Sequence, residues 1–197
     1  MRQFEWHPND INSSLLFCAM NKQNAGTLIE DFKHTTDIWI QALAQYNFAQ
    51  LCTKPSPEGW SLGQVYIHLI DNTDYFIKQI KISLSTNDHA MEEASDGAKA
   101  MFLQNCFPDE MLDGPPSNTH TPQPDSKERL MVELMNLKDE ITGVEILISN
   151  SACKGKTKHP GLQFFNANEW LQFAEMHLRH HLRQKKRIDS FLKTESY

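Results

Sequence analysis

The chain has 197 residues, 25 acidic against 19 basic side chains and a formal net charge of −6 at pH 7, with 40% hydrophobic residues. This length and composition suit one folded domain with a sizeable core, and they exclude a disordered chain. The acidic balance argues against a general nucleic-acid-binding protein, and no apolar run approaches the roughly 18 residues of a membrane span.

Residues 1–21 are expected to form a loosely attached extension, and residues 22–197 the folded domain. The apolar run before Met20 is short and follows acidic side chains, which argues against a signal peptide. Helix-like sequence begins directly after Met20, so translation from either Met1 or Met20 stays open. The four cysteines are widely spaced without a CxxC motif, which is typical of reduced thiols in a cytoplasmic protein.

The first two helices are predicted from apolar side chains at three- and four-residue steps. One covers residues 22–52 and ends at the prolines and glycine of residues 54–59. The second begins after Trp60, where Ser61 and Gln64 form a capping-box pattern. His68 follows at the border of its apolar stripe, which comprises Leu62, Val65, Leu69, Phe76 and Ile80.

Residues 85–123 carry no clean periodicity and contain several prolines, although Met91 to Gln104 could form a short helix. A connection of this length usually crosses over or builds a site. In a four-helix bundle, it lets the third helix run parallel to the second.

Two more cap signals mark the remaining helices. Asp125 with Glu128 resembles a capping box, and an apolar stripe follows it to Ile148. Asn166 with Glu169 opens the last helix, which is expected to end near residue 192. The sequence therefore predicts an all-α protein: a four-helix bundle with one long connection between the second and third helices.

His177 and His181 lie four residues apart on the edge of the apolar face of the last helix. Side chains at this spacing sit one above the other, about 5–6 Å apart at Cβ, and two imidazoles so placed can bind one metal ion at about 2.0–2.1 Å. His68 is the best third ligand, because it also borders a core face. The alternative is three histidines that only pack in the core.

Four further side chains are candidates for the surroundings of such a site. Asp71 and Asn72 follow His68 by three and four residues, and either could orient its ring. Gln64 lies one turn before His68. His180 is three residues from His177 but points around the helix, and is better interpreted as a flanking residue than as a ligand.

The chemistry expected of this site follows from its neutral ligands. Leu178 follows His177, so the HExxH motif and its glutamate base are absent from this helix. Three neutral imidazoles leave a divalent ion its full charge and open positions, which lowers the pKa of a bound water or thiol. The basic residues that follow are best interpreted as a solvated helix end, with an anion-binding patch as the alternative: Arg179, Arg183, Lys185, Lys186 and Arg187.

These residues resemble the DinB/YfiT-like superfamily of metal-binding four-helix bundles. The resemblance rests on the run from Trp60 to His68, on His159-Pro160, and on residues 169–184 with their terminal HLRHHLRQ, and it spans about residues 22–194. It implies an up-down-down-up bundle with a crossover between helices 2 and 3. It also implies zinc or nickel held by the histidines that map onto His68, His177 and His181.

The resemblance further implies activities and partners. Members with known activity include thiol-dependent S-transferases and isomerases that use low-molecular-weight thiols such as bacillithiol or mycothiol, and members are often homodimers. We therefore expect an enzyme that transfers a small thiol to an electrophilic small-molecule substrate in a stress response, or a metal-dependent hydrolase. The alternatives are a non-catalytic metal-binding or interaction module, and a plain helical bundle. Neither a nucleic acid nor a membrane is expected as a partner.

Overall fold

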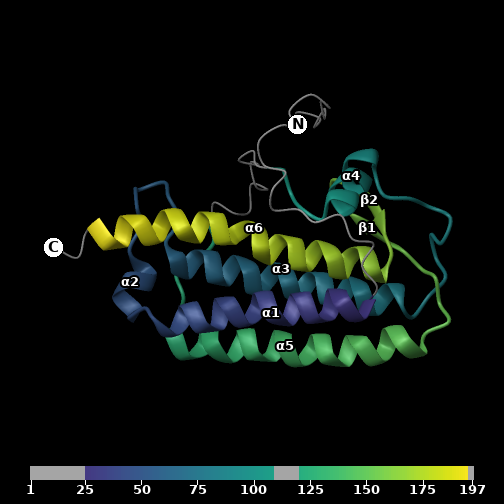
Figure 1. Ribbon diagram of the computed structural model, residues 1–197, viewed down its shortest axis with the longest axis horizontal. Coiled ribbons are helices and arrows are strands. Elements are labelled where there is room, and N and C mark those ends of the chain that lie inside the picture. The colour runs from purple at the N-terminus through teal and green to yellow at the C-terminus, as the bar shows by residue number, and fades with distance from the viewer. Residues whose placement is uncertain (1–24, 109–119, 195–197) are drawn as a thin grey trace.

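A computed structural model describes residues 25–108 and 120–194 of the chain. Four long helices lie side by side in an elongated bundle (Figure 1): α1 (Ala25–Ala44), α3 (Leu62–Ser83), α5 (Lys127–Asn150) and α6 (Ala167–Thr194). The described chain also contains the short helices α2 (Phe48–Cys52) and α4 (Asp96–Gln104) and the antiparallel strands β1 (Thr157–His159) and β2 (Gln163–Phe165). The predicted helical bundle is confirmed, with one small hairpin added at one end.

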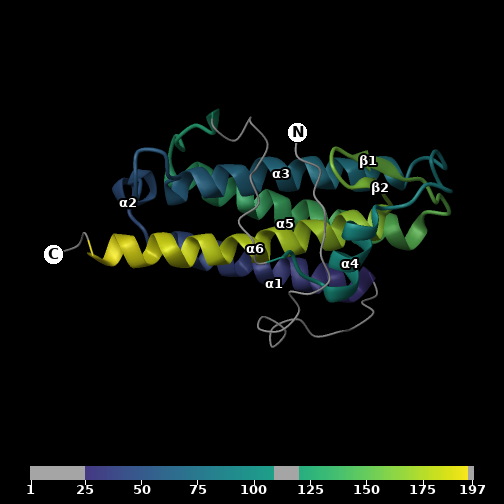
Figure 2. The ribbon, with the colours of Figure 1, turned by 90° about the horizontal axis from the view of Figure 1, so that it is seen from above.

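The directions in which the four long helices run follow from contacts at their ends. The Lys127 ammonium at the start of α5 donates to the backbone oxygens of Ala44 and Tyr46, at 2.9 and 2.7 Å, so α5 begins where α1 ends. At the other end, the N–H of Gly155 donates to the oxygen of Thr86, so α5 and α3 finish together. The helices therefore run up, down, down and up, as predicted. Both α1 and α3 pack against α5 and α6. The end of α3 and the start of α5, which the long connection joins, lie at opposite ends of the bundle (Figures 1 and 2).

The capping boxes predicted for two helices are present. The Ser61 hydroxyl accepts from the N–H of Gln64 at 3.2 Å, and the Gln64 side chain accepts from the N–H of Ser61 at 3.1 Å. Asn166 and Glu169 exchange the same pair of bonds at 3.0 and 2.8 Å. At α5 the predicted cap was one residue early, because the hydroxyl of Ser126, not the carboxylate of Asp125, accepts from the N–H of Arg129.

The prediction of a single helix over residues 22–52 was wrong. Helix α1 ends at Ala44, and Asn47 starts a new helix, α2, through a capping box with Gln50 at 2.9 and 3.0 Å. An asparagine side chain that accepts a backbone N–H competes with the helix ladder, so it favours a helix start over a helix interior. Phe48, the first residue of α2, is exposed.

The buried core joins three helices next to the histidine-bearing turn of α6. The indole N–H of Trp39 in α1 donates to the backbone oxygen of Leu178 at 3.1 Å, and the Tyr66 hydroxyl in α3 donates to the oxygen of Trp39 at 2.9 Å. All three side chains are almost fully buried. Because Leu178 directly follows His177, these bonds fix the register of that turn against α1 and α3.

Two further features concern the described residues. No helix among them is both long and apolar enough to cross a membrane. No disulfide joins Cys52, Cys106 and Cys153, the cysteines in this part of the chain. The predicted extension, residues 1–21, lies outside the described residues.

Gly63→Ala is expected to destabilise the fold by about 2–3 kcal/mol, because a Cβ at this position overlaps packed neighbours. It would lie 2.6 Å from Cγ of Pro124 and 2.8 Å from the backbone oxygen of Leu51, and a backbone atom cannot move aside cheaply. Gly143→Ala is the matched control. Nothing lies within 4 Å of its Cβ position in α5, so this change should stabilise by about 0.5–1 kcal/mol. Urea unfolding of both variants measures the difference, and equal effects would contradict the packing described.

Candidate metal centre

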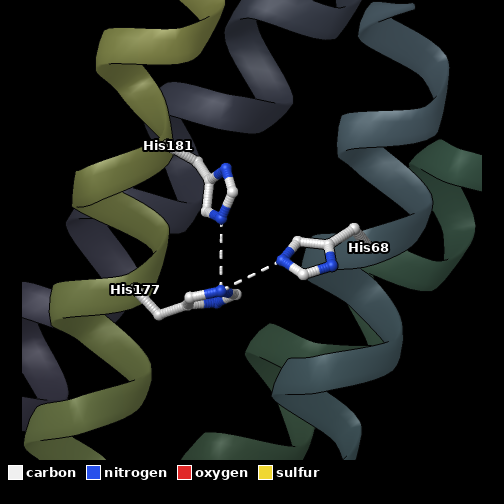
Figure 3. Close-up of side chains that lie close together, drawn as sticks. All are labelled: His68, His177 and His181. Atoms are coloured by element: carbon white, nitrogen blue, oxygen red, sulfur yellow. Dashed lines mark hydrogen bonds between the residues drawn. The ribbon is translucent and has the colours of Figure 1, made fainter. Parts of the chain in front are cut away.

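Three histidines converge between α3 and α6, at a point where the two helices pack together (Figure 3). The Nε2 atom of His177 lies 3.1 Å from Nε2 of His68 and 3.2 Å from Nε2 of His181. One nitrogen from each ring lies within 4.8 Å of the other two. The structure therefore brings together the three residues predicted as ligands from two helices, with His68 and His177 separated by 109 positions in the sequence.

The separations of His177 Nε2 from the other two ligand nitrogens match those of ligands on a common ion. Two nitrogens at about 2.0–2.1 Å from one ion, with an angle near 90–110° between the bonds, lie about 2.8–3.4 Å apart. The two closest Nε2 pairs, at 3.1 and 3.2 Å, fall within this range. His68 is buried, and the other two rings are half-buried.

Hydrogen bonds among the protein groups leave this cluster unsatisfied. A neutral imidazole carries one hydrogen, so the Nε2 of His177 cannot donate to both neighbours at once. Its other nitrogen, Nδ1, is buried and has no hydrogen-bond partner among the described residues. Three nitrogen lone pairs that face one another can be satisfied by a shared electron-pair acceptor. A divalent ion fits this donor set, since neutral imidazole is a common ligand of zinc and nickel.

The rings are neutral at ordinary pH. Burial lowers the pKa of His68 from 6.5 to about 4, and burial followed by the charge of His68 lowers that of His181 to about 3. The pKa of His177 falls well below its usual value, because the ring is desolvated and lies between the other imidazoles. A neutral ring offers a lone pair to a metal and a charged ring does not, so this environment prepares the cluster for an ion.

Two amide side chains contact the outer nitrogens of the cluster. Oε1 of Gln184 lies 2.8 Å from Nδ1 of His181 and accepts its hydrogen, which leaves Nε2 with a free lone pair. The amide nitrogen of Asn72 lies 3.1 Å from Nδ1 of His68 and also donates to the backbone oxygen of His68 at 2.8 Å. This donor places the hydrogen of a neutral His68 ring on Nε2, so a metal at Nε2 would require that hydrogen to move to Nδ1 and the Asn72 amide to turn away from the ring.

The other predicted neighbours lie elsewhere. Asp71 is exposed and lines a surface pocket of about 220 Å³ with Arg129 and Glu133 of α5. Gln64 closes the cap of α3 and donates to the backbone oxygen of Thr121 at 2.6 Å, so it holds the crossing segment and not a histidine. The spacing at His68 allowed Asp71 or Asn72, and the structure places Asn72 at the ring. Gln184 was missed, although its distance of three residues from His181 is the signal that could have found it.

His180 is half-buried and packs its ring 5.4 Å from the centroids of both His181 and Phe107. It flanks the cluster, and its nitrogens are not among the converging ligand atoms in the described residues.

Aromatic rings surround the three imidazoles. The rings of Trp60 and His68 pack in an edge-to-face manner at 5.1 Å between centroids, and those of Phe76 and His177 at 5.6 Å. Phe107 lies 6.4 Å from His177 and is itself buried against Phe173. These apolar neighbours exclude water and strengthen electrostatic interactions at the cluster.

The segment that carries Phe107 is fastened to α6 at two points. The Gln172 amide donates to the backbone oxygen of Phe102 at 2.8 Å, and the Arg179 guanidinium donates to the oxygen of Asn105 at 2.8 Å. Arg179 is held in place by the buried carboxylate of Glu175 at 2.9 and 2.7 Å. The helix that supplies two histidines therefore also positions the ring that packs beside them.

Comparison with known proteins gives a family and a structural neighbour for this chain. The family model of the DinB superfamily matches residues 31–184. In structure the chain is similar to YfiT from Bacillus subtilis, described as a probable metal-dependent hydrolase with an unusual four-helix bundle topology. That match has a TM-score of 0.53 and 14% sequence identity, and covers 95% of this chain and 94% of YfiT. At this identity, it shows a shared fold alone. Curated proteins give no significant match.

Proposed function

The chain belongs to the DinB superfamily, and from this premise we propose that it is a divalent-metal-dependent enzyme with His68, His177 and His181 as its metal ligands. Its preferred reaction is the transfer of a low-molecular-weight thiol to an electrophilic small-molecule substrate. The observation that carries the proposal is the convergence of three imidazole nitrogens within 4.8 Å, from two helices, in an aromatic surrounding.

A bound zinc or nickel ion would supply charge that lowers the pKa of a water or thiol at an open position. The residues of the chain do the remaining work. His68, His177 and His181 stay neutral at physiological pH and bind without cancelling the charge of the ion. Gln184 fixes the ring of His181 through its Nδ1 hydrogen, and Trp60 and Phe107 keep water from the imidazoles on their side.

Thiol chemistry suits this surrounding better than water chemistry for a physical reason. A thiolate is large, polarisable and weakly hydrated. It therefore loses less hydration free energy than hydroxide does when it enters an apolar site. The cluster contains no Asp, Glu or Cys ligand within the described residues, so it also offers no carboxylate base to activate water. Hydrolysis is the second candidate, because the structurally similar YfiT is described as a probable metal-dependent hydrolase.

Purified, untagged protein loaded with zinc or nickel tests the proposal with a model electrophile and several small thiols. We expect a conjugation rate that exceeds the rate of thiol alone and disappears on chelation. Ester hydrolysis without thiol, lost on the same chelation, would favour the second candidate. Metal binding without either reaction would instead support a non-catalytic metal-binding module. The homodimer and cytoplasmic location expected from the sequence stay predictions.

A further inference from the structure

Trp60 is the one tryptophan in the described part of the chain whose indole N–H has no acceptor there. Trp39 donates to the backbone oxygen of Leu178 at 3.1 Å, and Trp170 donates to the hydroxyl of Thr157 at 2.7 Å. Trp60 is half-buried, and its N–H forms no hydrogen bond with a described residue. Tryptophan in a buried position usually has a partner for this N–H, so the donor at Trp60 is left for water or for a ligand.

The indole of Trp60 lies directly against one of the three histidines of the candidate metal centre. Its ring packs edge-to-face with His68 at 5.1 Å between centroids, and Nε2 of the same His68 ring lies 3.1 Å from Nε2 of His177. An ion bound at about 2.0–2.1 Å from these nitrogens would lie at most about 8 Å from the centre of the indole. A small molecule that binds the ion through one end can therefore reach the indole N–H with an atom a few bonds away.

The cap of α3 holds the chain at Trp60 in place. Ser61 follows it directly and is fully buried, with its N–H bonded to the Gln64 side chain at 3.1 Å and its hydroxyl donating to Oε1 of Gln123 at 2.8 Å. Gln64 in turn donates to the backbone oxygen of Thr121 at 2.6 Å. These bonds join the start of α3 to the end of the crossing segment. A donor that is positioned before its ligand arrives loses little conformational entropy on binding.

We propose that Trp60 is a specificity-determining residue, whose indole N–H donates a hydrogen bond to a carbonyl oxygen of the substrate while the reacting end of that substrate lies at the three imidazoles. This inference rests on the proposed metal-dependent function and narrows its substrates to compounds with such an oxygen a few bonds from the metal-bound atom. An indole N–H donates and cannot accept, so it favours an acceptor over an apolar group of the same shape.

Thiol probes with and without a carbonyl oxygen test this inference. Cobalt-loaded protein is titrated with mercaptoacetamide and N-acetylcysteamine, which carry the oxygen at two distances from the sulfur, and with butanethiol, which carries none. Binding is followed by the sulfur-to-cobalt absorption band, which does not require turnover. Trp60→Phe keeps an aromatic ring at His68 and removes the N–H. It should weaken at least one carbonyl probe by about three- to tenfold and change butanethiol by less than about twofold.

Phe107→Leu is the matched control, because it alters an aromatic ring that lies 6.4 Å from His177 and carries no donor. It should change the binding of all three probes by a similar factor. The inference is overturned if Trp60→Phe leaves both carbonyl probes unchanged, if it weakens butanethiol as much as it weakens them, or if wild type gives the band with butanethiol alone. A cobalt-loaded wild type without a sulfur band for any probe would instead contradict the proposed metal and thiol chemistry, and this inference would fall with it.

Discussion

His177→Ala is expected to lower zinc affinity by about 100- to 1000-fold, because it removes one of three ligands worth about 3–4 kcal/mol each. His177 is the central ring of the cluster, since its Nε2 lies next to Nε2 of both His68 and His181. Isothermal titration with zinc measures the loss. Gln184→Leu should lower zinc affinity less, by about tenfold, because it removes only the hydrogen-bond acceptor that orients His181.

His34→Ala provides the control for this series. His34 is exposed on α1 and its nitrogens are not part of the converging cluster in the described residues. It should therefore bind zinc as wild type does. The ligand assignment would be wrong if His34→Ala and His177→Ala lowered affinity equally, or if His177→Ala left it unchanged.

The metal-free protein should lose about 5 kcal/mol of stability between about pH 7.5 and pH 5.5, because four buried or half-buried imidazoles resist protonation in the folded state. The pKa values of His68 and His159 are lowered from 6.5 to about 4, that of His181 to about 3, and that of His177 well below its usual value. Below the ordinary histidine pKa the unfolded chain binds protons that the folded chain does not, so stability falls as pH falls. Each ring contributes about 1.3 kcal/mol over this interval.

Urea unfolding at several pH values, with metal removed by a chelator, measures this slope. Most carboxylates stay charged over the same interval, so the imidazoles dominate it. His68→Asn introduces a side chain that does not titrate and should flatten the curve by about one quarter. A flat curve for the wild type would show that the rings are hydrated and not buried as described.

Much of the fold could be predicted from local sequence signals, because helix starts are local. Two helix starts were predicted correctly from capping pairs, Ser61 with Gln64 and Asn166 with Glu169. Each cap depends on residues only three positions apart. The same signal was present at Asn47 and Gln50, where the apolar spacing around it favoured one continuous helix. The hairpin of residues 157–165 was not predicted, because three-residue strands are too short to show alternation.

The candidate site could be predicted only in part. A spacing of four residues places His177 and His181 together on any helix, so that pair needed no structure. Whether His68 meets them depends on the rotation of α3 against α6. That rotation is set by packing between the two helices, such as the stacked rings of Phe76 and Trp170, and not by spacing within one helix. The choice between Asp71 and Asn72 had the same origin, because both positions neighbour His68 on a helix.

The surroundings of the site depend on segments that are distant in sequence. Phe107 comes from the long crossing segment, where the sequence showed no clean periodicity. Its place beside His177 depends on Gln172 and Arg179, which bind the backbone of residues 102 and 105. Contacts from side chains to remote backbone oxygens leave no pattern in a single sequence, so this part of the site could be found only in three dimensions.

X-ray absorption at the zinc edge tests the central claim most directly, because it counts the imidazoles on the ion. The zinc-loaded protein should show three imidazole nitrogens at about 2.0–2.1 Å, with the remaining positions filled by water or another exchangeable ligand. His68→Ala should reduce the imidazole count to two. A spectrum without imidazole scattering, or one that His68→Ala leaves unchanged, would contradict a single ion shared by α3 and α6.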